Sequence, residues 1–555
     1  MNGQENTALP LSECQSELWP ARRAENSRGP DSVGQYTEIL GPIDTAVLEL
    51  ALRQVVDETE AIHARFTEIG GKPFQVIGEA PPWRLETIDV SAESDPREAA
   101  EAWMRTDMRQ AADPVAYALF ELAADRYIWY QRYSRLLMDG FGSSSLARRV
   151  AELYGAALRG EPYEPPGHTP LHDLLDHESV YRESERYERD RRYWHEHFAV
   201  RPDPAAIPGR RSENGPVPRV TGALPPASVA ALRAAGLRTG SSRGTLVVAA
   251  VAAFLCRTTG ADEAVLTLPA AGRIGAQALR TPGALANVLP FRLPVRAGLS
   301  LADLAHRAGR EINGLLGHQG FRGERLHDEL DWPGDDRRHF GPFVSVTPSG
   351  PDLRFGEHRG IVRYLPSRPV AEFDVLMSGA SDDGGLRVDL DVNPALYDED
   401  WARAHHHAFL GFLEQATAEP ATPVGRIGAV NSTGRGLVVE RWNRTAVPVD
   451  AAPLSELFRR QAAVSPDAVA VVGDELSLSY GELLGRSERV ARQLIGAGVG
   501  PECRVAVAVE RSALMVAAVL GVSMAGGVFV PVDPGYPAER VGLIFADAAP
   551  SVVLC

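Results

Sequence analysis

One short segment of the chain concentrates side chains that could do chemistry. Residues Ser134–Gly140 read SRLLMDG and follow an aromatic-rich run, RYIWYQRYS, which predicts a β-strand. A guanidinium has five hydrogen-bond donors, no acceptor and a permanent charge, so Arg135 cannot act as a general base. Ser134 has no neighbouring base that would activate its hydroxyl as a nucleophile. Asp139 is a single carboxylate in a turn, and a structural role fits it better than acid/base catalysis.

The elements around this segment follow from hydrophobic spacing. The predicted strand places alternate side chains on one face, namely Tyr127, Trp129, Gln131 and Tyr133. After the Asp139-Gly140 turn we expect a helix with Ser143–Ser145 as its N-cap and an apolar stripe of Leu146, Val150, Leu153 and Ala157. An earlier helix, capped by Asp44, carries the stripe Leu48, Leu52 and Val55.

Other candidate sites are weaker. Consecutive residues of a helix point in different directions, so His405-His406-His407 is interpreted as solvated histidines and not as a metal site. The run Gly140-Phe141-Gly142-Ser143 is glycine-rich but lacks the lysine and spacing of a phosphate-binding loop, and it is interpreted as a turn and a cap. Lys72 is the only lysine of the chain. No metal site and no bound cofactor are expected.

Composition excludes several classes of function. The 555 residues include 57 Lys+Arg and 73 Asp+Glu, which gives a formal charge of −16. Nucleic acids and anionic membranes bind basic patches, so an acidic chain disfavours both as partners. The four cysteines show no CxxC spacing, and the N-terminus has neither the basic nor the apolar part of a signal peptide. We therefore expect a cytoplasmic protein.

Two apolar runs are interpreted as core segments and not as membrane spans. Leu246–Cys256 is too short to cross a bilayer, and Ser512–Val532 contains glycine and proline and predicts a helix that turns into a buried strand. The charge-dense residues 176–200 predict a solvated connecting helix. From Leu454 onward amphipathic helices alternate with Val-rich strands, which predicts a parallel sheet.

Taken in order, the motifs resemble the condensation domain of a nonribosomal peptide synthetase followed by the start of an adenylation domain. The family motif SxAQxxLW corresponds to SECQSELW at Ser12–Trp19, and the motif HHxxxDG corresponds to SRLLMDG at Ser134–Gly140. A later family segment that ends in NVLP corresponds to Pro282–Pro290. His318-Gln319 and Phe340-Gly341-Pro342 match the branch found in siderophore synthetases. The first two adenylation signatures are LSYGEL and MAGGVFVPVDP, at Leu478–Leu483 and Met524–Pro534.

The resemblance implies an α/β fold. Two chloramphenicol-acetyltransferase-like lobes would form a V with a central tunnel, followed by a partial α/β adenylation N-subdomain. We assign residues 1–175 to the N-lobe, 176–430 to the C-lobe, 431–453 to a polar, proline-containing linker, and 454–555 to the truncated start of the adenylation domain. Because the last α/β stretch stops on a strand, we expect a fragment of a longer polypeptide.

The resemblance also implies roles for the motif residues. In the family, substrates reach the tunnel as phosphopantetheine thioesters on carrier proteins, and the second histidine of HHxxxDG acts at its centre. Arg135 takes that position here, and Ser134 replaces the first histidine. The family pairs the motif aspartate with an arginine of the second lobe, which implies a structural pair of Asp139 and Arg273. Gly140 would leave room where the substrate arms meet, although a turn alone also accounts for a glycine.

Three functions are considered for a chain with this resemblance. The first is a docking platform for upstream and downstream carrier proteins, or for a tailoring hydroxylase or oxygenase, with little or no amide formation. The second is an active condensation domain that uses geometry and the electrostatics of Arg135. The third, a stand-alone acyltransferase, is disfavoured by the adenylation signatures. The phosphate-binding loop and lysine of an adenylation domain are missing before Cys555, so this fragment is not expected to activate an amino acid.

Overall fold

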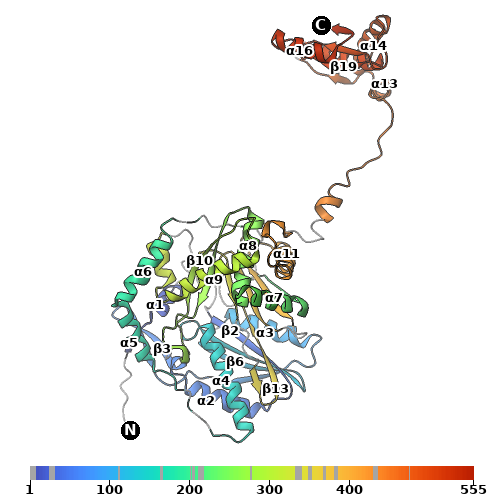
Figure 1. Cartoon of the computed structure of the whole chain (residues 1–555). Helices are drawn as coiled ribbons and strands as arrows, with labels where there is room; N and C mark the ends of the chain where they lie inside the picture. Colours follow the sequence, from blue (N-terminus) through green and yellow to red (C-terminus); the bar gives the residue numbers. More distant parts are fainter. Residues whose placement is uncertain are drawn as a thin grey trace. The chain divides into compact units, whose positions relative to one another are not determined.

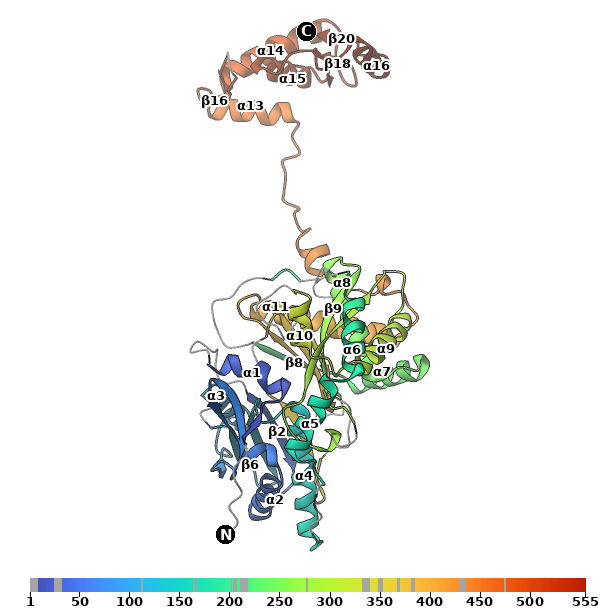
Figure 2. The same cartoon turned by 90° about the vertical axis from the view of Figure 1, so that its left-hand side faces the viewer.

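The chain divides into two compact units, Met1–Val439 and Glu440–Cys555 (Figure 1). The computed structural model describes residues 8–23, 32–110, 113–162, 165, 167–200, 202, 207–209, 218–275, 278–331, 340–347, 353–366, 370–380, 385–428, 436–473 and 476–555. Within the first unit, two six-stranded sheets with their helices form two neighbouring lobes (Figure 2).

The first sheet has the strand order β12-β13-β2-β7-β6-β5. Its strands are β2 (Ser32–Leu40), β5 (Leu85–Asp89), β6 (Val115–Ala123), β7 (Arg126–Ser134), β12 (Leu353–Phe355) and β13 (His358–Tyr364). Only β5 and β6 pair in parallel. Three helices cover it: α2 (Thr45–Asp57) and α4 (Gly140–Leu158) pack on one face, and α3 (Pro96–Gln110) packs on the other.

The strand β7 confirms the expected alternation. Trp129 and Tyr133 are buried beneath α2 and α4, whereas Ile128 and Tyr130 are buried on the α3 side. The expected stripe of α4 is buried at three positions, but Ala157 is exposed. The predicted cap of α4 was wrong: the helix begins at Gly140, and the carboxylate of Asp139 accepts a hydrogen bond from the amide of Gly142. The cap at Asp44 and the buried stripe of α2 are confirmed.

The second sheet has the order β10-β9-β11-β14-β15-β8. Its strands are β8 (Arg219–Leu224), β9 (Glu263–Ala270), β10 (Asn287–Pro294), β11 (Phe343–Val346), β14 (Phe373–Ala380) and β15 (Leu386–Val392). The helices of this lobe are α7 (Pro226–Thr239), α8 (Arg243–Thr259), α9 (Leu301–Gly317), α10 (Gly323–Glu329) and α11 (Glu399–Ala418). Every residue of Leu246–Cys256 is buried in α8, which confirms this run as core.

A segment of the second half of the chain crosses into the first sheet. Strand β13 pairs antiparallel with β2, and Phe355 at the end of β12 packs edge-on against Trp129 and Tyr154. The range 176–430 expected for the C-lobe therefore also contributes to the N-lobe. Pairing between residues more than 300 positions apart leaves no local signal in the sequence.

The charge-dense connection was predicted wrongly as a single solvated helix. It forms α5 (Leu171–Arg182) and α6 (Glu185–His197), and α6 buries Tyr187, Asp190 and Trp194. Asp190 accepts a hydrogen bond from Tyr181 and contacts the ring of His318 at 2.7 Å. The spacing of the buried residues, i, i+3 and i+7, marks a narrow inward face among the charges.

The second unit confirms the expected parallel sheet. Its strands β18 (Arg504–Val507), β19 (Val528–Pro531) and β20 (Val552–Leu554) pair in parallel, beside α13 (Leu454–Val464), α14 (Tyr480–Gly496), α15 (Ala513–Met524) and α16 (Ala538–Ala548). Two short strands, β16 (Val469–Val471) and β17 (Leu478–Ser479), form a separate pair.

The run Ser512–Val532 forms a helix and then a strand, but β19 is mostly exposed and not buried as predicted. Of the expected linker, residues 431–435 lie outside the described residues, and 442–453 are largely exposed without helix or strand.

Among the described residues, no single helix is both long and apolar enough to cross a membrane. The pair α7 and α8 passes the same test only when both helices are counted together, and they are bent by 100°.

Glu372, just before β14, predicts a pH dependence of stability. Its atom Oε2 is buried without a hydrogen-bond partner, and burial raises the pKa of this carboxyl from 4.5 to about 7. The folded state therefore holds the proton more tightly than the unfolded state, so this contribution to stability is complete below pH 4.5 and is lost as the pH rises through 7. The free energy of unfolding, measured in urea, should fall between pH 5 and 8 in the wild type, and Glu372→Gln is expected to reduce that fall by roughly 1–3 kcal/mol. Glu357→Gln, at an exposed glutamate, is the control; equal slopes for both variants would contradict the prediction.

Candidate functional site

The Ser134–Gly140 turn joins β7 to α4 and is closed by backbone hydrogen bonds. The amides of Leu137 and Met138 donate to the carbonyl of Ser134 at 2.9 and 3.0 Å, and the amide of Ser134 donates to Pro114 at 2.7 Å. The three residues 136–138 are buried, whereas Ser134 and Arg135 are half-buried. The turn thus leaves only its two polar residues partly accessible ahead of Asp139.

Asp139 is held by five donors. The guanidinium of Arg273 contacts its two carboxylate oxygens at 2.8 and 3.1 Å, and the amides of Gly142, Leu285 and Ala286 donate at 2.7, 3.0 and 2.8 Å. The side chain of Arg273 is fully buried. A carboxylate with this many donors has no acceptor capacity left for a substrate. The ion pair named from the sequence is therefore present, and it ties the turn to the segment before β10.

Gly140 and Gly142 differ in whether a side chain would fit at their positions. At Gly140 an added Cβ would meet nothing within 4 Å, and φ is not positive. The chain itself therefore does not require glycine there, and the space lies outside the protein atoms. At Gly142, which the sequence reasoning missed, a Cβ would lie 2.3 Å from Met138 Sδ and 3.0 Å from the amide nitrogen of Gly283. Gly142 allows α4 to approach the second lobe.

The later motifs support the arginine of this ion pair. The side chain of Gln319 accepts a hydrogen bond from the amide of Gly272 at 3.2 Å, next to Arg273. Asn287, in the NVLP motif, donates to the carbonyls of Gln319 and Phe321 at 2.9 and 2.8 Å. These contacts hold the loop that carries Arg273. None of these hydrogen bonds is made to the Ser134–Gly140 turn itself.

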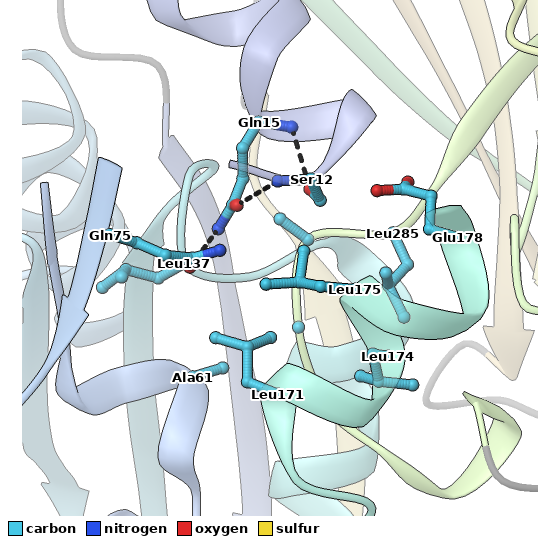
Figure 3. A pocket seen from close by; sticks show the side chains of 12 residues that line it. Ser12, Gln15, Ala61, Gln75, Leu137, Leu171, Leu174, Leu175, Glu178 and Leu285 are labelled. Carbon is cyan, nitrogen blue, oxygen red and sulfur yellow. Dashed lines mark hydrogen bonds between the residues drawn. The ribbon is translucent and has the colours of Figure 1, made fainter. Parts of the chain in front are cut away.

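The opening motif lies against the turn from the other side (Figure 3). Gln15 on α1 (Glu13–Arg23) donates to the carbonyl of Leu136 at 2.9 Å and to Gln75 on β4 (Lys72–Ile77) at 3.1 Å. A small pocket adjoins these groups. Its walls come from six segments and are mainly aliphatic: Ser12, Gln15, Ala61, Gln75, Leu137, Leu171, Leu174, Leu175, Glu178, Gly283, Ala284 and Leu285. Sequence reasoning identified the motif but not this contact.

Burial also perturbs charged groups on α1. Burial raises the pKa of the Glu17 carboxyl, and the guanidinium of Arg322 beside it opposes this rise. Burial likewise raises the pKa of the Cys14 thiol to about 12, so this cysteine is not a nucleophile at neutral pH. Both residues stand on the opening motif, yet neither supplies a reactive group.

Of the three consecutive histidines, His407 is exposed as predicted, but His405 and His406 are not solvated. His406 is buried in α11 with its ring 2.9 Å from the carbonyl of Val388, and His405 stacks on Trp401 at 3.9 Å. Burial lowers the pKa of both rings. Within the described ranges, no three His, Cys, Asp or Glu side chains gather as a group that could hold a metal ion.

The two units match two protein families. The condensation domain family matches residues 5–436, and the AMP-binding enzyme family matches residues 458–555. Each of three synthetases aligns with 98% of this chain: the dimodular nonribosomal peptide synthase of Bacillus subtilis at 35% identity, the isonitrile lipopeptide synthase of Streptomyces coeruleorubidus at 37%, and enterobactin synthase component F of Escherichia coli at 29%. The chain spans only 23%, 37% and 43% of their respective lengths.

Solved condensation domains share the fold. The first condensation domain of the calcium-dependent antibiotic synthetase, in complex with a substrate analogue, has a TM-score of 0.71 at 33% identity, covering 77% of this chain and 99% of that chain. A mutant starter condensation domain of the rhizomide synthetase, in complex with C8-CoA, has a TM-score of 0.68 at 32% identity, covering 76% and 98%. The expected fold class is confirmed by these matches. The chain belongs to the condensation-domain family of nonribosomal peptide synthetases and continues into the start of an AMP-binding domain.

Proposed function

We propose that this domain binds thioester-loaded carrier proteins as a docking platform and forms amide bonds slowly or not at all. The observation that carries the proposal is the contrast within one turn. Asp139 keeps five hydrogen-bond donors, so the scaffold of the motif is intact, whereas Arg135 occupies the position of the family's second histidine. A domain that keeps the binding scaffold but lacks a proton acceptor at this position is suited to docking carrier proteins and not to forming amides.

The chemistry of aminolysis explains why the replacement matters. An attacking amine must lose a proton as it adds to the thioester carbonyl, and a neutral imidazole accepts that proton near neutral pH. A guanidinium has no acceptor atom, and its charge also disfavours a nearby protonated amine. Ser134 adds no base. Amide formation here therefore lacks the proton transfer that general-base catalysis provides.

Amide formation assisted by Arg135 is the second candidate. It is favoured by the half-buried position of the guanidinium, where a cation could stabilise the oxyanion of a tetrahedral intermediate. A thioester is already activated, and holding both reactants in place can contribute about 7–11 kcal/mol. The variant Arg135→Met separates the two candidates: it lowers the rate only if the guanidinium assists the reaction.

The space at Gly140 gives a direct test of thioester binding. Gly140→Leu is expected to weaken binding of a phosphopantetheine-loaded carrier domain at least about tenfold, because the side chain would occupy the space beside the turn. The protein should stay folded, since no atom lies within 4 Å of the new Cβ. Isothermal titration calorimetry with octanoyl-loaded and unloaded carrier domains provides the measurement.

Gly411→Leu is the matched control, because Gly411 also lies on a helix, α11, with nothing within 4 Å of an added Cβ. Equal affinity of both variants for the loaded carrier would show that the turn does not face the thioester. If the wild-type domain binds loaded carriers, a pull-down with tailoring oxygenases of the same pathway then tests whether the platform also recruits such an enzyme.

A further inference from the structure

Helix α1 reaches the active-site turn through a buried amide. The side chain of Gln15 is almost fully buried, and its Nε2 donates both to the carbonyl of Leu136 at 2.9 Å and to Gln75 Oε1 at 3.1 Å. Its Oε1 accepts from the amide of Ser12 at 2.9 Å. Leu136 directly follows Arg135, so this bond holds the Leu136–Leu137 peptide group, one residue beyond the substituted position.

A second connection runs from the same helix to Asp139. The carboxylate of Glu17 contacts the guanidinium of Arg322 at 3.0 and 3.1 Å, and Arg322 donates to the carbonyl of Ala286 at 2.9 Å. The amide of Ala286 in turn donates to Asp139 at 2.8 Å. The backbone before β10 therefore lies between two arginine–carboxylate pairs, Arg322 with Glu17 of α1 and Arg273 with Asp139 of the turn.

The turn is also packed against α1. Leu136 is buried in one cluster with Cys14 and Leu18 of α1, and a small pocket adjoins Leu137 and Gln15 on the same side (Figure 3). Close packing holds a backbone segment in place, and a directional hydrogen bond fixes the orientation of its peptide group. The bond from Gln15 therefore adds orientation to a segment that packing already confines.

We propose that Gln15 and Glu17 are positioning residues: α1 holds the active-site turn from two sides, by the hydrogen bond to Leu136 and by the route through Arg322 to Asp139. The inference rests on the proposed use of this turn as the substrate-facing site. It assigns the opening motif of the chain a role at the turn that lies more than 100 residues later.

The first arm of the test measures the turn itself. In the full chain, Gln15→Met removes the hydrogen bond to Leu136 while nearly conserving side-chain volume, and is expected to speed amide hydrogen exchange at 134–140 at least about fivefold. Gln75→Met is the matched control, because it removes the bonds of Gln75 to Gln15 and to Pro10 but leaves the bond to Leu136. Equal exchange at 134–140 in both variants would overturn the proposal. Exchange elsewhere reports any general loss of stability.

The second arm measures chemistry. In whichever form condenses, the wild type or the variant with histidines at 134 and 135, Gln15→Met is expected to lower kcat about tenfold or more with little change in KM. A purely structural residue would instead lower the amount of folded enzyme. An unchanged kcat overturns the positioning role, whereas condensation by the wild type contradicts only the proposed function. If neither form condenses, the exchange measurement decides alone.

Discussion

The double substitution Ser134→His and Arg135→His is expected to raise the rate of amide formation by at least about a hundredfold. The change puts an acceptor atom at the position where the family carries its catalytic imidazole, on a turn whose hydrogen bonds are already in place. It also removes a fixed positive charge that disfavours a protonated amine. Peptide released from carrier-bound donor and acceptor is quantified by mass spectrometry.

Single substitutions separate the two effects. Arg135→His supplies the acceptor and should recover most of the rate, whereas Ser134→His alone leaves the guanidinium in place and should recover little. Arg135→Met removes the charge without adding a base. If Arg135→Met condenses as fast as Arg135→His, relief of charge and not proton transfer limits the reaction, and the explanation given for the platform is wrong.

Asp139→Ala is expected to destabilise the first unit by about 3–5 kcal/mol, because it leaves the guanidinium of Arg273 buried without a carboxylate. The substitution also removes the acceptor for the amides of Gly142, Leu285 and Ala286. Urea denaturation followed by tryptophan fluorescence is a suitable measurement, since seven of the eight tryptophans lie in Met1–Val439.

A double-mutant cycle identifies the cause of that loss. The variant Asp139→Ala/Arg273→Met removes both charges, so its loss of stability should be smaller than the sum of the two single losses. Additive losses would mean that the ion pair is not coupled and that the turn is held by its backbone hydrogen bonds alone. Asp139→Asn keeps the shape of the side chain and should be less damaging than alanine.

Local patterns predicted the elements that carry the site. The alternation of aromatic residues identified β7, and the spacing of Leu146, Val150 and Leu153 identified α4. Both signals depend only on neighbouring residues, which is why they are readable in one sequence. The start of α4 was misplaced because three serines resemble a cap, while the actual cap, Asp139, also serves the ion pair with the second lobe.

Contacts between distant segments could not be predicted in this way. Strand β13 joins the first sheet from beyond residue 350, and Gln15 contacts Leu136 across 121 positions. Such pairs depend on how the two lobes assemble. The buried face of α6 was missed for another reason, because the charges around Tyr187 and Trp194 concealed their helical spacing.

Resemblance supplied what local patterns lacked. The ion pair between Asp139 and Arg273 was named only because the motif matches a known family, and the structure contains it. The same resemblance made Arg135 conspicuous, since the expected residue is histidine. The role of Gln15 was not predicted, although its place in the opening motif was the one available signal.

A single-turnover measurement tests the central claim most directly. The wild-type domain, in excess, is mixed with donor-loaded and acceptor-loaded carrier domains at pH 7, and peptide is followed over time beside the variant with histidines at 134 and 135. The account predicts that the wild type binds both carriers but forms peptide no faster than the carriers do without it. Rapid peptide formation by the wild type, at the rate of the histidine variant, would contradict the claim that replacing the proton acceptor with Arg135 disables condensation.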